Sequence, residues 1–248
     1  AGKNEDGGPP GAYEDSHRPA MTLDSKGNIF VTHMGGAVVS KITPEGSVTL
    51  DYAAFGTSDY HSLHVPSVYG NRIPLAITSD VFDNVYTAND DLTISKISAT
   101  GAITPVFATI FENANPGYGH TPFQMTADRQ GNIYVVTVGV TVTELITVSR
   151  VTPEGVVTPM FATLPQGSYY SATNIVCDAA GFLYTATNTG YTFATDPFST
   201  VSKIDPSGTV VATFTLPNPH NSSTPSNTTV SGIAIDAEAN VYTLGTIA

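Results

Sequence analysis

The chain has few positive charges and a single cysteine, and each shortage excludes a class of function. Nine Lys plus Arg stand against 21 Asp plus Glu, for a formal net charge of −12. The basic residues are scattered, so no basic stripe is available to neutralise phosphates, and nucleic acid is not an expected partner. Cys177 has no second cysteine to pair with, which excludes an internal disulfide and favours a buried, inert thiol.

Long apolar runs and the common nucleotide or nucleophile signatures are also missing. No uninterrupted apolar stretch approaches the ~20 residues that a membrane-spanning helix needs, so we expect no membrane insertion. The sequence has no G-x-S-x-G, no Walker loop, no C-x-x-C and no G-x-G-x-x-G opening a helix. The sequence therefore does not indicate a nucleotide-binding protein, an enzyme with a serine nucleophile or a zinc-ribbon protein.

The polar composition favours an extracellular or cell-surface location. Thr, Ser, Asn and Gly dominate the polar positions, while charged residues make up only 12% of the chain. Asn221 and Asn227 each begin an N-x-[ST] glycosylation sequon. The chain begins with Ala, as a chain does after removal of a leader or after trimming.

A short pattern occurs five times: an Asp, followed six residues later by an aromatic residue. The pairs are Asp24 and Phe30, Asp80 and Tyr86, Asp128 and Tyr134, Asp178 and Tyr184, and Asp236 and Tyr242. Apolar residues flank each pair as they do in a β-hairpin. After the first four hairpins a third strand, S-[KR]-[IV], leads through a turn to a fourth. Repeats of four strands at this period are typical of propellers.

The sequence therefore predicts an all-β fold, a β-propeller of about five four-stranded antiparallel blades with the fifth incomplete. Residues 1–18 are rich in Gly and Pro and should form an extended arm. Residues 19–248 should form a single propeller domain. The blades are expected at about 19–56, 74–110, 122–165, 172–217 and 230–248.

Within the blades, the repeated residues have expected structural roles. The Asp should accept hydrogen bonds from turn amides, and the aromatic should fill the space toward the rim. Alternation along the first strand should place Met21, Leu23, Ile77 and Met125 between neighbouring blades.

The repeat resembles the NHL and SMP-30/gluconolactonase-like propellers, in which a D-x-x-G-N hairpin precedes a basic residue and a T-P-x-G turn. It also resembles the virginiamycin B lyase propellers. The resemblance covers about residues 17–248 and implies a fold rather than an activity. In the lyase type, histidines before the inner strands bind a metal or act as acid or base, and His17 and His120 match that position. The lactonase type needs Glu, Asn and Asp around one divalent ion, whereas the inner strands here offer Gln124 and Asn174.

Several polar residues should gather at the mouth of the central channel. Those placed before or on inner strands, as candidate ligand contacts, are Arg72, Tyr169, Tyr170, Gln124 and Asn174. The candidate metal ligands are His17, His33, His120 and Asp90, of which His17 and His120 are also the catalytic candidates. Imidazoles and carboxylates from different blades can form a site of this kind. The alternative is that these are hydrogen-bonded surface residues.

The fifth repeat stops after its hairpin, which leaves one strand edge open. The expected recipient edge contains Asn240, Val241, Tyr242, Thr243 and Ile247. An open edge recruits strands, so the missing pair must come from elsewhere in the protein or from another molecule. We therefore expect a homo-oligomer or a protein partner through the fifth blade, and head-to-tail association would form a filament.

Two functions are compatible with these features. The first is a secreted or cell-surface propeller that acts as a binding or structural module, which is self-assembling if the open blade joins copies, and which requires no cofactor. The second is a metal-assisted lactonase or lyase that uses one divalent cation at the channel mouth. The absence of a complete acid-base or metal constellation favours the first.

Overall fold

The computed structural model describes residues 19–33, 37–55, 73–111, 120–139, 146–164, 170–189, 199–216 and 228–247. Within these ranges all the regular secondary structure is β-strand, in five antiparallel sheets. No helix in the described part is long and apolar enough to cross a membrane.

Each sheet is one blade, and its strands follow one another in chain order. Blade one contains β1 (Met21–Leu23), β2 (Ile29–Thr32), β3 (Val38–Ile42) and β4 (Val48–Ala54). Blade two contains β5 (Pro74–Ser79), β6 (Val85–Asn89), β7 (Thr93–Ile97) and β8 (Ile103–Thr109). Blade three contains β9 (His120–Ala127), β10 (Ile133–Gly139), β11 (Ile146–Val151) and β12 (Val157–Thr163). Blade four contains β13 (Tyr170–Cys177), β14 (Leu183–Thr189), β15 (Ser199–Ile204) and β16 (Val210–Thr215). Blade five contains β17 (Thr228–Ile235) and β18 (Val241–Ile247).

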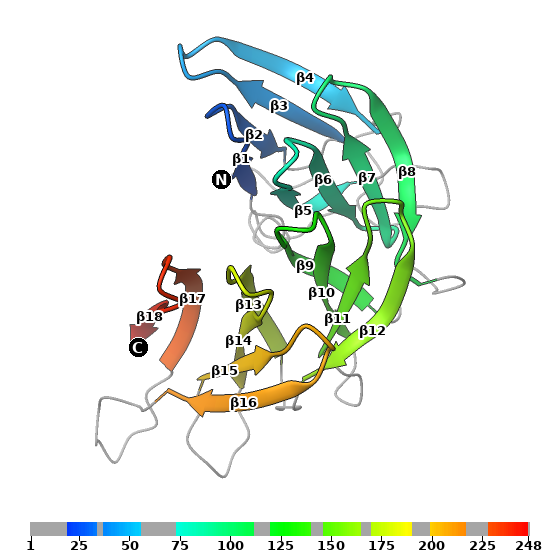
Figure 1. Cartoon of the computed structure of the whole chain (residues 1–248). Coiled ribbons are helices and arrows are strands. Elements are labelled where there is room, and N and C mark those ends of the chain that lie inside the picture. Colours follow the sequence, from blue (N-terminus) through cyan, green and yellow to red (C-terminus); the bar gives the residue numbers. More distant parts are fainter. Residues whose placement is uncertain are drawn as a thin grey trace, which may run out of the picture.

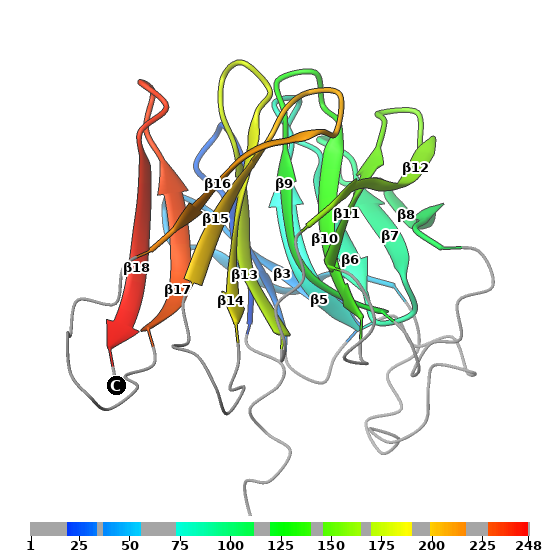
Figure 2. The same ribbon diagram turned by 90° about the horizontal axis from the view of Figure 1, so that it is seen from below.

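The blades stand side by side in an arc, with blades one and five at its two ends (Figure 1). The first strand of each blade lies toward the centre of the arc, and the fourth strand lies on its outer rim. The turns within the hairpins of strands one and two lie on one face (Figure 2). The predicted β-propeller with an incomplete fifth blade is confirmed.

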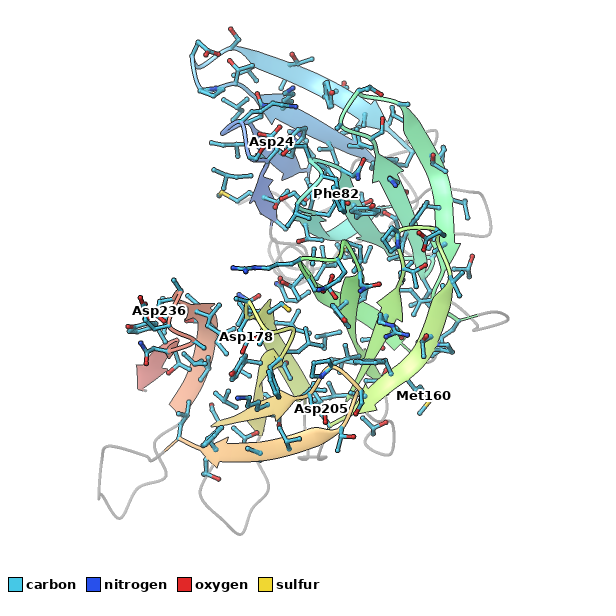
Figure 3. All side chains as sticks on the ribbon, in the orientation of Figure 1. Asp24, Phe82, Met160, Asp178, Asp205 and Asp236 are labelled. Atoms are coloured by element: carbon cyan, nitrogen blue, oxygen red, sulfur yellow. The ribbon has the colours of Figure 1, made fainter. Side chains whose placement is uncertain are left out.

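The repeated aspartate organises the turn of each hairpin, as the sequence predicts. Asp128 Oδ1 accepts hydrogen bonds from the amides of Gln130 and Asn132, both at 2.9 Å. Its Oδ2 accepts from Asn132 Nδ2 at 2.8 Å and from Tyr134 Oη at 3.0 Å. Figure 3 shows Asp24, Asp178 and Asp236 at the same place in their own blades. The hydroxyl bond, which was not predicted, explains why a tyrosine follows the Asp by six residues in blades two to five, whereas blade one has Phe30 there.

A second repeated contact accounts for the basic residue of the S-[KR]-[IV] strand. The Lys96 ammonium lies 5.3 Å from the Tyr86 ring centroid and 4.8 Å from that of Phe107. It therefore sits between an aromatic of strand two and an aromatic of strand four, where cation–π attraction holds it. Lys41 lies between Phe30 and Tyr52 in the same way. Arg150 lies over Phe161 of strand four, and Lys203 lies over Phe182 and Tyr184 at the start of strand two. Four of the nine positive charges are thus structural.

The hydrophobic core lies between successive blades. Tyr134 of blade three packs with Ile175 and Leu183 of blade four, and all three are buried. Burial and the Asp128 carboxylate both raise the pKa of Tyr134, so its hydroxyl stays protonated and continues to donate. Each blade therefore completes its core only when the next blade covers it.

The inner-strand side chains follow the predicted alternation in blades two and three but not in blade one. Ile77 and Met125 are buried between blades, as expected. Met21 and Leu23 are instead 67% and 56% exposed, so that part of the prediction is wrong. The physical reason is position: β1 lies at an end of the arc, where no described blade precedes it.

Replacing Tyr134 with Ala should lower the free energy of unfolding by about 3–5 kcal/mol, because a large side chain is removed from between two blades. Tyr134→Phe should cost about 1 kcal/mol, since it removes only the hydroxyl bond to Asp128. Tyr242→Ala, at the equivalent but exposed position, should cost about 1 kcal/mol or less. Denaturant unfolding of the three variants checks this, and equal losses at Tyr134 and Tyr242 would contradict it.

Candidate functional site

The candidate residues from blades one to four lie at equivalent ends of their blades. His120 and Tyr170 begin the inner strands β9 and β13, opposite Gly139 and Thr189 at the ends of the second strands. His33 and Asp90 directly follow the second strands of blades one and two. His17, Arg72 and Tyr169 lie outside the described residues, as do the side chains of His120 and Tyr170. Their convergence on one ligand stays a prediction.

His33 is held within its own blade. Its Nε2 lies 2.6 Å from Oγ of Ser40, a buried residue on β3. One ring nitrogen is therefore engaged by a structural hydroxyl of the neighbouring strand. The histidine connects the end of β2 to β3.

Asp90 is hydrogen-bonded to Ile73, the residue that directly precedes the inner strand of blade two. Its Oδ1 accepts a hydrogen bond from the Ile73 amide at 2.9 Å, and its own amide donates to the Ile73 carbonyl oxygen at 3.0 Å. Burial raises the pKa of Asp90 to about 6 against the opposing effect of the Ile73 amide, and the neighbouring Asp91 raises it further. A carboxyl that titrates near neutrality at the end of a blade has the property expected of an acid-base group.

A buried polar network that was not predicted fixes the turn around Asp90. Asn89 is fully buried, and its Nδ2 donates to Thr93 Oγ1 at 3.0 Å and to Ser95 Oγ at 2.9 Å. The Thr87 hydroxyl donates to Asn89 Oδ1 at 3.0 Å. The Asn89 side chain thus donates through its NH₂ group and accepts through its oxygen, and these buried hydrogen bonds fix the turn. Residue patterns do not single out Asn89, because its position in the sequence is that of an ordinary strand end.

The inner strands share a β-bulge that residue patterns do not predict. The pairing with strand two skips one residue at the same place in four blades: Leu75, Phe123, Thr173 and Ser231. Gln124 and Asn174 directly follow the bulge in blades three and four, and both are half-buried. Bulges redirect side chains and are common beside binding sites. The two amides therefore occupy equivalent positions on adjacent inner strands.

No metal centre forms among the described side chains. Within that part of the chain, no group of three or more His, Cys, Asp or Glu residues is placed to hold an ion. The candidate ligands His33 and Asp90 therefore belong to no such group among the described residues. Cys177, the lone cysteine, has its pKa raised to about 12 by burial and by the carboxylates of Asp128 and Asp178. That shift agrees with an inert thiol rather than a nucleophile.

The two ends of the arc carry the largest departures from the repeat. On β18, Tyr242 and Leu244 are 58% and 70% exposed, and we call them the trailing face of blade five. Their equivalents in blades two to four are buried under the following blade. Met21 and Leu23 form the corresponding leading face of blade one. Among the described strands, β18 pairs only with β17.

Sequence comparison finds no relative, and structural comparison finds propellers. No family model and no curated protein matches the sequence. The fold is similar to virginiamycin B lyase from Staphylococcus aureus, with a TM-score of 0.58 and 18% identity over 94% of this chain and 64% of the lyase. It is also similar to PorZ, a bacterial surface component of the type-IX secretion system of Porphyromonas gingivalis, with a TM-score of 0.53 and 11% identity over 92% of this chain and 31% of PorZ. A gluconolactonase from Xanthomonas campestris matches with a TM-score of 0.39 and 13% identity over 92% of this chain and 82% of the enzyme.

The similarity to the lyase confirms the resemblance in fold. The chain spans less than two thirds of the length of the lyase. At such low identities the comparison carries the architecture and no activity.

Asp90→Asn should stabilise the protein at pH 7 and have little effect at pH 4. The pKa of Asp90 is about 6 in the folded state against an ordinary value of 3.8, so folding favours the protonated carboxyl. The free energy of unfolding therefore falls as pH rises from about 4 to about 6. Allowing for partial exposure, removing this group should gain about 1–2 kcal/mol at pH 7.

Thermal unfolding of wild type and variant across this pH range measures the effect. Asp51→Asn, which removes the same charge from an exposed position on β4, is the matched control. A pH dependence that is identical in Asp90→Asn and wild type would contradict the prediction.

Proposed function

We propose that this chain is a self-associating β-propeller, a binding and structural module that works outside the cell or at its surface. In this proposal the trailing face of blade five in one copy packs on the leading face of blade one in the next. The observation that carries the proposal is that residue positions buried between blades inside the arc are exposed at its two ends. The extracellular location rests on the composition.

The interfaces inside the arc supply the template for this contact. Between blades four and five, Tyr184 packs in one buried cluster with Val230 and Ile233. Tyr242 is the counterpart of Tyr184, and Met21 is the counterpart of Ile233, by their common distance from the turn aspartate. Each end therefore presents one half of an interface that this sequence already forms between its own blades.

The chemistry of the two faces also suits mutual burial. Met21, Leu23 and Leu244 are aliphatic, and Tyr242 keeps its hydroxyl bonded to Asp236 Oδ2 at 2.9 Å. The ring can thus enter an apolar contact without an unpaired hydroxyl. Burying apolar surface of this kind contributes about 25 cal/mol per Å² to association. Because the two contacting faces differ, the association is head-to-tail. The rotation between successive copies decides whether the assembly is an open filament or a closed ring.

Analytical ultracentrifugation over a wide range of protein concentration tests the proposal. Wild type should associate as its concentration rises. Leu244→Glu and Met21→Glu should each remain monomeric, because each places a charge on one of the two faces. Leu50→Glu changes a side chain of similar exposure, 68%, on the outer rim and should associate as wild type does.

A mixture of the two monomeric variants distinguishes head-to-tail contact from other modes. Leu244→Glu retains blade one and Met21→Glu retains blade five, so the mixture should form heterodimers and stop there. Wild type that stays monomeric at every concentration, or association that survives in Leu244→Glu alone, would refute the proposal.

A further inference from the structure

Blades two and four carry matching sets of polar side chains on strands two and three, and the sets differ at one position. The set in blade two is Thr87, Asn89, Thr93 and Ser95. The set in blade four is Thr185, Thr187, Thr200 and Ser202. The first and last members of each set lie directly opposite each other on the paired strands. The difference is Asn89 against Thr187, nine residues after the turn aspartate in each blade.

In blade two, the side-chain amide of Asn89 joins the other three members of its set. Its Nδ2 donates to Thr93 Oγ1 and Ser95 Oγ, and its Oδ1 accepts from the Thr87 hydroxyl, all at 2.9–3.0 Å. The Ser95 hydroxyl in turn donates to the Pro105 carbonyl oxygen at 2.7 Å. All the hydroxyls of this set are therefore paired within the blade.

In blade four, two hydroxyls of the set are left unpaired. Thr187 is one atom shorter than asparagine, and its Oγ1 lies 2.7 Å from Thr200 Oγ1. Thr185 Oγ1 and Ser202 Oγ are buried and have no hydrogen-bond partner among the described residues. Ser202 pairs with Thr213 in a regular part of the ladder, so no bulge carbonyl accepts its proton.

The neighbouring blade does not supply the missing partner either. Alternation along β14 and β15 places Thr185 and Ser202 on the same face as Leu183 and Ile204. Those two side chains pack into the core shared with blade three, and that core is hydrophobic. Burying a hydroxyl without a hydrogen bond is costly, and most buried polar groups in proteins are paired with protein or with ordered water. The two hydroxyls therefore need a small polar partner.

We propose that blade four binds one ordered water molecule between Thr185, Thr200 and Ser202, in the place that the Asn89 amide takes in blade two. The water oxygen accepts from the Thr185 and Ser202 hydroxyls. One of its hydrogens donates to Thr200 Oγ1, as Asn89 Nδ2 donates to the equivalent Thr93. About three polar partners are typical of a buried water. The site lies inside one complete blade, so it does not depend on self-association or on either end of the arc.

Thr187→Asn gives blade four the complete set of blade two. The new side-chain amide should displace the water and bond the same hydroxyls. Because releasing an ordered water is entropically favourable, the Tm should rise by about 2–4 °C. Thr213→Asn makes the same chemical change at an exposed position on β16 and should shift the Tm by less than about 2 °C.

Thr185→Val distinguishes a hydrated hydroxyl from a dry one, because valine has nearly the same shape as threonine and no hydroxyl. If the Thr185 hydroxyl bonds a water, the substitution should lower the Tm by about 2–4 °C. A dry, unpaired hydroxyl destabilises the folded state, and valine removes that effect. A Tm that rises in Thr185→Val would therefore overturn the proposal.

Crystal diffraction at a resolution that shows ordered water locates the molecule directly. We expect a water within hydrogen-bond distance of the three hydroxyls in wild type, and the side-chain amide in its place in Thr187→Asn. Oxygen-17 magnetic relaxation dispersion gives the solution counterpart. The number of long-lived buried waters should fall by one in Thr187→Asn and stay unchanged in Thr213→Asn. The site is refuted if the Thr185 and Ser202 hydroxyls bond each other with no water between them, or if Thr187→Asn keeps the wild-type number of waters.

Discussion

The structure depends on the carboxylate in the first turn of each blade. In blade three one aspartate accepts from two backbone amides, one side-chain amide and one tyrosine hydroxyl. It thereby sets the turn, the register of the hairpin and the position of the largest side chain on strand two. The turn tolerates a left-handed φ at residues other than glycine, +62° at Asp83 and +64° at Ala239, because the carboxylate holds the backbone from inside.

Blade stacking follows from that anchored tyrosine. In blade two the ring of Tyr86 contacts Lys96 of strand three, and in blade three the ring of Tyr134 fills the core shared with blade four. Each inner blade therefore packs against the blade before it and the blade after it. A blade at an end of the arc has only one of these two contacts among the described residues. Met21, Tyr242 and Leu244 are exposed at positions that are buried between blades elsewhere in the repeat, and the counterparts of Leu23 in the other blades are half-buried. The proposed self-association starts from these unfilled interfaces.

Local spacing predicted much of the fold and little of the candidate site. The five hairpins and the turn aspartates were evident from residue patterns, because they depend on contacts within a few residues. The incomplete fifth blade was evident from comparing the fifth repeat with the other four. The Asn89 network and the repeated bulges were missed, since both depend on which strands pair and where the register shifts. The burial of Met21 and Leu23 was predicted wrongly for the same reason. A strand's alternation shows which side chains share a face but not whether another sheet covers it.

The sequence alone determined that this chain is a repeat of β-hairpins and that it is acidic. The tertiary structure decided which of the repeated apolar residues are buried, which strand edges are free and that a carboxyl such as Asp90 has its pKa raised. The physical reason is the range of the interactions. Turn hydrogen bonds act within six residues of sequence, whereas burial and desolvation depend on blades that lie about fifty residues apart in the chain.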